Sequence, residues 1–340
     1  MIYPVNTEYE IFSVGKRRHT LGAVFVLNHK KPLEIGVPPV RPVAEEARRQ
    51  GALLDLDKHS WPWSLMLVPV MKVDLFELAN NHMWRTQFFF RRWTIETKPQ
   101  SMQIESDSHG MTERGWMQYG FQTYYALLNC GFRMRPTAGT ASGVHPVPLG
   151  FSRVYVFLPK GFSYDRWIEG LDAGRSFVTT GPMLDIRFND KPPGHGFNVM
   201  PGTPARCRVQ GVAESLHRLD RIEVIANGTV VRQIRPKNQP RSAGGFRSPI
   251  DISLPLEGSV WIAVRCFEPR PNGRYRFAHT APVYFDRPGH PVRPRRADVQ
   301  FLVQRMEEEL RRNTGVLDES ALNEYREALG LYRRLLEKAR

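Results

Sequence analysis

The first half of the chain alternates between short apolar runs and segments with helical spacing. The clearest apolar runs are 21–28, 52–57, 73–79 and 154–158. Continuous runs of this length are typical of strands that are buried on both faces of a parallel sheet. The segments with helical spacing are 42–50, 119–129 and 162–175. This alternation predicts βα units that form an α/β barrel-like domain over residues 1–190.

Short strands replace this alternation after Pro182. The runs 221–226 and 229–234 flank Asn227-Gly228, and this dipeptide is the strongest short-range signal for a β-hairpin. Further strand-like runs follow at 259–268 and 281–285. Strands at this spacing predict an all-β sandwich over residues 191–287.

The last segment, 288–340, begins with a basic linker and continues with two amphipathic helices. Val299, Leu302 and Met306 share one face of the first helix, and Asp318 is placed to cap the second. We expect this helical tail to pack on its own chain. The alternative is that it binds a helix of a partner.

Polar residues follow the predicted strands. Asp57, Lys58 and His59 stand at the end of the run 52–57, and His82 follows the run 73–79. The carboxyl ends of parallel strands meet at one face of a barrel, so we expect these side chains to lie around one cleft. The alternatives are a turn packed by tryptophans around His59 and a helix-start histidine at position 82.

Four segments together resemble the PHP metallohydrolases (polymerase and histidinol phosphatase type), and within them the carbaryl-hydrolase-like CehA/McbA subgroup. These are LDKHSWPW at 56–63, VDLFELANNH at 73–82, AGTASG at 138–143 and GRSFVTTGPML at 174–184. The later segments WIAVR and AHTAPVYF also resemble the β-sandwich that follows the core in this subgroup. The resemblance implies a barrel-like domain that hydrolyses an ester, phosphoester or amide-like bond.

The resemblance also implies a site. Glu8 or Glu10 on one strand, with His19 before the next, is similar to the family's middle pair of metal ligands. Carboxylate oxygen and imidazole nitrogen suit Zn²⁺, Mn²⁺ or Fe. The candidate metal ligands are Glu8, Glu10, His19, His59 and His145, and the candidate catalytic residues are Lys58, His82 and Arg85. The alternative for the first pair is an exposed glutamate and a surface histidine in a basic turn.

Two departures from the family pattern change the functional expectation. Ala141 stands where the family has an aspartate, and the sequence contains no His-x-His. We therefore expect an incomplete barrel and a hydrolase that is truncated or catalytically degenerate, with at most one weakly bound divalent ion. The alternative is a non-catalytic binding or structural module.

Composition narrows these alternatives only slightly. The net charge of +14 suits an anionic partner or a phosphoester substrate, but the arginines are scattered, so nucleic-acid binding has no support beyond net charge. Three cysteines without a Cys-x-x-Cys motif favour buried free thiols. No apolar run approaches the ~18 residues of a membrane span, and no signal-peptide pattern is present. Compartment and oligomeric state are left open.

Overall fold

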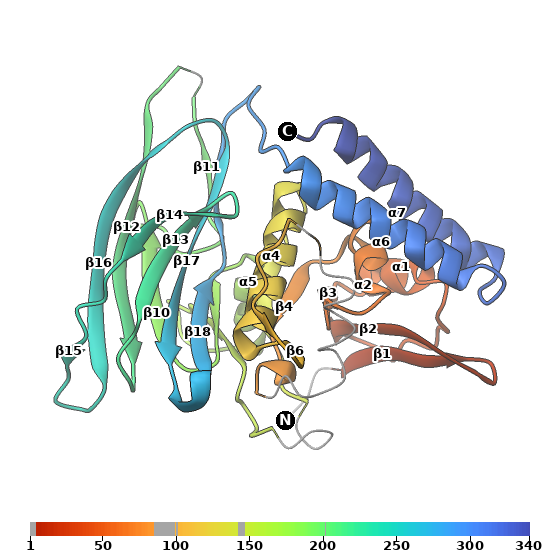
Figure 1. Cartoon of the computed structure of the whole chain (residues 1–340), viewed down its shortest axis with the longest axis horizontal. Helices are drawn as coiled ribbons and strands as arrows, with labels where there is room; N and C mark the ends of the chain where they lie inside the picture. Colours follow the sequence, from red (N-terminus) through yellow and green to blue (C-terminus); the bar gives the residue numbers. More distant parts are fainter. Residues whose placement is uncertain (1–4, 85–98, 100, 142–146, 201) are drawn as a thin grey trace.

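The computed structural model describes residues 5–84, 99, 101–141, 147–200 and 202–340. Figure 1 shows a β-sandwich on one side and an α/β unit on the other, with helix α4 (Glu113–Asn129) between them. Two long helices, α6 (Arg296–Asn313) and α7 (Glu319–Glu337), cross the α/β unit.

The α/β unit is built on a five-stranded sheet in the order β1-β2-β3-β4-β7. The strands are β1 (Val5–Val14), β2 (Arg17–His29), β3 (Leu53–Leu56), β4 (Leu75–Ala79) and β7 (Arg135–Ala138). The first three are antiparallel neighbours, whereas β3, β4 and β7 run parallel. The apolar runs 21–28, 52–57 and 73–79 therefore form strands of one sheet, as predicted.

The prediction of an incomplete α/β barrel is wrong. Among the described residues the sheet is open, because β1 and β7 lie at its opposite edges and do not pair. The run 154–158 adds no parallel strand to it. Its strand, β8 (Arg153–Val156), pairs antiparallel with β9 (Ser176–Thr179) in a different sheet. A continuous apolar run predicts that a strand is buried, but it does not predict which sheet the strand joins.

Short helices cover the sheet. They are α1 (Arg41–Arg49), α2 (Ser64–Leu67), the π-helical turn η1 (Val68–Lys72) and the 3₁₀ turn η2 (Asn81–Met83). A small hairpin of β5 (Ser106–Asp107) and β6 (Gly110–Met111) precedes α4. Helix α4 begins where the Thr112 hydroxyl accepts a 3.0 Å hydrogen bond from the Gly115 amide, a cap that extends it beyond the predicted 119–129.

The helical tail packs on its own chain, as predicted. Asp318 caps α7 by accepting a 2.9 Å hydrogen bond from the Ala321 amide. The Tyr332 hydroxyl donates to the Leu65 carbonyl at 2.7 Å, and the Glu324 carboxylate accepts hydrogen bonds from the amides of Val40 and Arg41. In the described part of the chain, no helix is long and apolar enough to cross a membrane.

The sandwich consists of two sheets that enclose a separate apolar core. The smaller sheet has the order β10 (Met183–Phe188), β12 (Ala205–Ser215), β16 (Phe246–Leu256) and β15 (Gln239–Pro240). The larger has the order β11 (Gly196–Asn198), β19 (Val283–Asp286), β17 (Val260–Pro269), β18 (Tyr275–Thr280), β9 and β8. Helix α5 (Tyr164–Asp172) links β8 to β9, so the sheets of the sandwich use residues well before position 191.

The predicted hairpin is present as β13 (Arg221–Ala226) and β14 (Thr229–Ile234), which attach to β17. Asn227 and Gly228 both have positive φ, 47° and 82°, as a two-residue turn of this kind requires. Cys207 and Cys266 are buried free thiols in the sandwich core, and burial raises the pKa of each to about 12.

Candidate functional site: a buried carboxyl cluster at the ends of parallel strands

Three acidic side chains meet where the parallel strands β3 and β4 end. Asp55 lies in β3, Asp57 directly follows it, and Glu77 lies in β4. All three are buried, with exposed fractions of 5% or less. Because β3, β4 and β7 are parallel neighbours, their polar residues meet at one edge of the sheet, which is the geometry that places sites in α/β folds.

Asp57 and Glu77 form a carboxyl pair. The two side chains lie close enough to shift each other's pKa: Glu77 lowers that of Asp57, and Asp57 raises that of Glu77. Burial raises the pKa of both groups, and for Glu77 the neighbouring charge of Asp57 raises it further. Gly139, after β7, leaves room for this pair, since a Cβ there would lie 3.1 Å from the Glu77 carboxyl carbon.

Asp55 is the third acid of the cluster, and a hydroxyl on β7, the other neighbour of β4, holds its carboxylate in place. The Thr137 hydroxyl, on β7, lies 2.7 Å and 2.8 Å from the two carboxylate oxygens of Asp55. Burial raises the pKa of Asp55 to about 7, against the opposing effect of the Thr137 hydrogen bond. The charge of the nearby Asp57 acts in the same direction as burial.

Lys58 provides the positive charge for these acids. It has a left-handed backbone, φ 54°, that turns its side chain back onto the strand ends. Its ammonium lies 2.6 Å from Asp57, 3.0 Å from Glu8 and 3.5 Å from Glu10. Burial alone would lower the pKa of Lys58, but the carboxylates of Asp57 and Glu8 outweigh it and raise the pKa. Lys58 therefore stays charged at neutral pH.

The rings of His59 and His82 both pack against Trp116 of α4. Their ring centroids lie 5.4 Å and 5.5 Å from that of Trp116. His59 also stacks on Phe76 of β4, and burial lowers its pKa to about 4 despite a contact with the Glu77 backbone. Neither ring nitrogen of His59 has a hydrogen-bond partner of standard geometry within the described residues.

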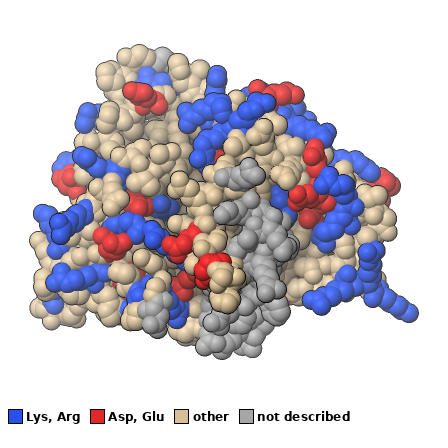
Figure 2. Space-filling model, viewed as in Figure 1, with Lys and Arg blue, Asp and Glu red and all other residues tan. Residues whose placement is uncertain are grey.

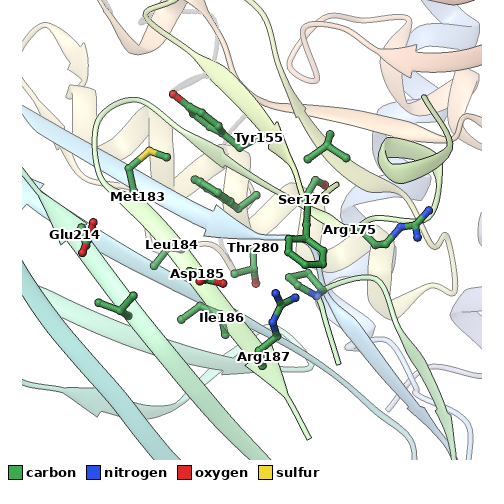
Figure 3. Close-up of a pocket in the computed structure, with 15 residues that line it drawn as sticks. Tyr155, Arg175, Ser176, Met183, Leu184, Asp185, Ile186, Arg187, Glu214 and Thr280 are labelled. Atoms are coloured by element: carbon green, nitrogen blue, oxygen red, sulfur yellow. The ribbon is translucent and has the colours of Figure 1, made fainter. Parts of the chain in front are cut away.

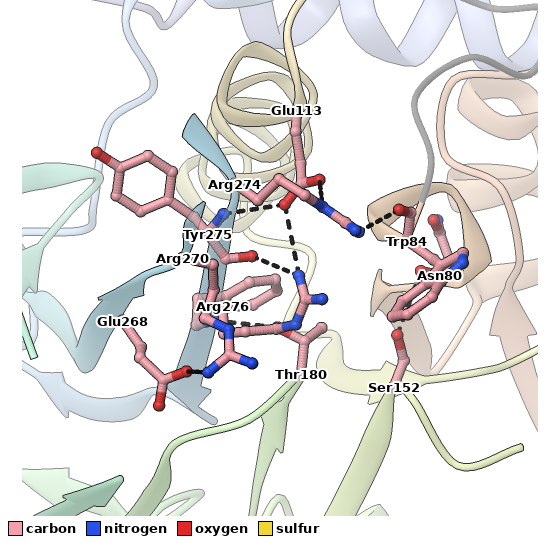
Figure 4. Close-up of polar contacts among 11 residues, drawn as sticks. Asn80, Trp84, Glu113, Ser152, Thr180, Glu268, Arg270, Arg274, Tyr275 and Arg276 are labelled. Carbon is pink, nitrogen blue, oxygen red and sulfur yellow. Dashed lines mark hydrogen bonds and ion pairs between the residues drawn. The ribbon is translucent and has the colours of Figure 1, made fainter. Parts of the chain in front are cut away.

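Arginines from the sandwich reach the turn that follows β4 (Figure 4). Arg274 donates to Glu113 at 3.0 Å and to the Trp84 carbonyl, and Arg276 lies 3.5 Å from Glu113. The guanidinium of Arg276 also packs over the Trp84 ring at 5.5 Å. Burial lowers the pKa of Arg276, and the positive charges of Arg274 and Arg270 act in the same direction, while Glu113 opposes them.

The remaining predicted site residues do not join this cluster. The His19 ring forms a hydrogen bond with Asn313 of α6, with 2.7 Å between Nε2 of His19 and Oδ1 of Asn313. Glu8 and Glu10 are near the cluster, but they bind Lys58. Arg85 and His145 lie outside the described residues.

The described donor set does not fit a metal centre. Across the described ranges, no group of three or more His, Cys, Asp or Glu could hold a metal ion. The carboxylates that would attract a cation already surround the Lys58 ammonium.

Asp55, Glu77 and Thr137 are site residues that the sequence analysis did not select. A signal existed for the two acids, since each interrupts an otherwise apolar run, LLDL and LFEL. An acid in a strand buried on both faces needs a partner, and that alone marks it as a candidate. Thr137 opens a small polar loop at a strand end, which is a usual position for site residues, but nothing in that loop identifies Asp55, 82 residues away, as its partner.

No family model, curated protein or solved structure matches this chain. The similarity to the PHP metallohydrolases therefore stays a prediction that depends on the four sequence segments.

Proposed function

We propose that this chain is a hydrolase of ester, phosphoester or amide-like bonds, and that its acid–base groups are the carboxyls of Asp57 and Glu77. The observation that carries the proposal is the burial of two interacting carboxyls beside the fixed ammonium of Lys58. Buried acids cost stability that apolar residues would not. Carboxyls with strongly shifted pKa values at strand ends are typical of catalytic sites.

The carboxyl pair supplies both roles that hydrolysis needs. Its ionised member accepts a proton from the attacking water, and its protonated member donates one to the leaving group. Lys58 keeps its proton, so it acts as a stabiliser of negative charge and not as a base. Arg274 and Arg276, which reach the turn after β4 and share the carboxylate of Glu113, are the groups that we expect to bind an anionic part of a substrate.

The test is an assay of the full chain with p-nitrophenyl acetate, bis-p-nitrophenyl phosphate and an acyl p-nitroanilide. We expect turnover of at least one substrate class, and a loss of at least about 100-fold in kcat for Glu77→Gln and for Asp57→Asn. The matched control is Glu169→Gln, the same chemical change at an exposed position of α5. Wild-type activity in Glu77→Gln would contradict the proposal.

Measuring the same activity in excess EDTA distinguishes this proposal from metal-dependent hydrolysis. Activity that persists in excess EDTA supports the carboxyl pair as the acting groups. Activity that disappears with EDTA and returns with Zn²⁺ or Mn²⁺ would show that the described donors do not account for the chemistry.

One observation favours a second candidate, a non-catalytic module that binds an anionic partner. Lys58 already neutralises the acids around it, as a purely structural counter-ion would. The basic side chains, however, are spread over the face in Figure 2 and interspersed with acids, so no single basic patch favours one partner there. Binding of polyphosphate that weakens steeply with salt, together with no turnover of any substrate, would favour this module.

A further inference from the structure

The sandwich carries a groove that the proposed reaction does not use (Figure 3). Its volume is about 360 Å³, within the range of about 300–1,000 Å³ that small-molecule sites occupy. The outward faces of β10 and β12 form one wall, and the edge strand β8 with its neighbour β9 forms the other.

Aromatic side chains of this groove are exposed although their sequence pattern predicts burial. Tyr155 and Phe157 are 37% and 41% exposed. The Tyr155 ring stacks on Phe177 with centroids 5.2 Å apart and planes 8° apart, and the guanidinium of Arg187 packs over the Phe157 ring at 4.0 Å. Both rings are therefore held in place by a neighbour while part of their surface faces solvent, as in a prebuilt binding platform.

Polar groups of both signs stand beside these rings. Asp185 and Arg187 alternate along β10, so they project from the same face of the sheet, and neither forms an ion pair within the described residues. The other acid, Glu214, is neutralised by Arg241 at 2.8 Å. The buried hydroxyl of Ser176 has no hydrogen-bond partner in the described part of the chain.

This combination selects one class of ligand. A ligand with a single charge would be attracted by one of these two groups and repelled by the other, so its charge gains little net energy here. A wholly apolar ligand would desolvate both charges without replacing their hydrogen bonds. A sugar meets all the requirements, because its C–H faces pack on aromatic rings while its hydroxyls both donate and accept. We propose that this groove binds a neutral oligosaccharide.

The roles of the residues follow from their chemistry. The exposed parts of Tyr155 and Phe157 contact the apolar faces of successive sugar rings. Asp185 accepts hydrogen bonds from sugar hydroxyls and Arg187 donates to them. An extended peptide paired with the edge of β8 is the competing occupant, and the experiment distinguishes it.

The test is calorimetric titration of the full chain with neutral hexasaccharides of glucose, xylose, mannose and N-acetylglucosamine. We expect one series to bind, and Phe157→Ala and Asp185→Asn each to weaken that binding by about tenfold. Phe162→Ala removes an equally large side chain that is 76% exposed outside the groove, and it should leave binding unchanged.

Three results would overturn the inference. They are the absence of heat with every hexasaccharide at millimolar concentration, an equal loss of binding in Phe162→Ala, and binding of decanoate or an extended peptide in place of the sugars. Thermal unfolding of each variant identifies any misfolded protein, and Asp185→Asn changes an exposed group and keeps its shape, so at least one groove variant stays informative.

Discussion

The ammonium of Lys58 lies 2.6 Å from the carboxylate of Asp57, the residue directly before it, in the interior of the α/β unit. Adjacent residues in a strand point to opposite faces, so this contact exists only because Lys58 leaves the strand with a left-handed backbone. The turn places one positive charge beside Asp57 at the end of β3 and beside Glu8 and Glu10 of β1.

Replacing Lys58 with methionine should strongly destabilise the protein. The variant leaves Asp57 buried without its counter-ion, and breaking a buried pair costs about 3–5 kcal/mol. The measurement is urea-induced unfolding at pH 8. Lys160→Met, at an exposed position, should change the free energy of unfolding by less than about 0.5 kcal/mol. Equal effects in the two variants would contradict a buried ion pair.

Asp55→Asn should stabilise the protein, and the gain should grow with pH. Burial raises the pKa of Asp55 from 3.8 to about 7, so the folded chain holds this proton more tightly than the unfolded chain. Stability is therefore lost as pH rises from about 4 to about 7, and the full cost is present above pH 7. Asparagine removes that cost and still accepts from Thr137. We expect a gain of about 4 kcal/mol at pH 8 and almost none at pH 4.

The measurement is the free energy of unfolding of both proteins at pH 4, 6 and 8. Glu169→Gln serves again as the exposed control and should show no such trend. A gain that is equal at all three pH values would mean that ionisation of Asp55 is not its source.

Gly139→Ala should reduce hydrolysis without unfolding the chain. A Cβ at this position would lie 3.1 Å from the Glu77 carboxyl, so Glu77 would have to move by a few tenths of an ångström. We expect a fall in kcat/KM of about tenfold or more. Gly36→Ala is the matched control, because a Cβ there meets no atom within 4 Å. Unchanged kinetics in Gly139→Ala would separate Glu77 from the reaction.

His19→Ala should affect stability and not catalysis. Its buried ring is hydrogen-bonded to Asn313 of α6, and the substitution leaves the amide oxygen of Asn313 without that hydrogen bond. The expected cost is about 1–3 kcal/mol of unfolding free energy, with kcat unchanged in the folded protein. Lost activity at unchanged stability would instead support the metal-ligand role that the sequence predicts.

Divalent metals should not stabilise the chain. A ligand that binds only the folded state raises the unfolding midpoint, and the described donors already enclose Lys58. We expect the midpoint of thermal unfolding of the chelator-treated protein to stay unchanged when Zn²⁺ or Mn²⁺ is added. A clear rise with either ion would restore the metal-site prediction.

Local patterns in the sequence determined the elements whose contacts are close along the chain. Asn227-Gly228 sets the β13–β14 hairpin, because few other residues adopt two successive positive φ angles. Asp318 sets the start of α7 by capping amides three residues away. The placement of Lys58 and His59 directly after a buried strand was likewise readable from the apolar run before them.

Tertiary structure decided which strands pair and which charges meet. The run 154–158 had the pattern of a buried parallel strand, yet β8 pairs antiparallel at an edge of the sandwich with partly exposed side chains, because the run specifies no partner. Lys58 meets Glu8 across 50 residues, and His19 meets Asn313 across 294. Such contacts depend on how whole sheets and helices pack, and no short-range preference of the chain encodes them.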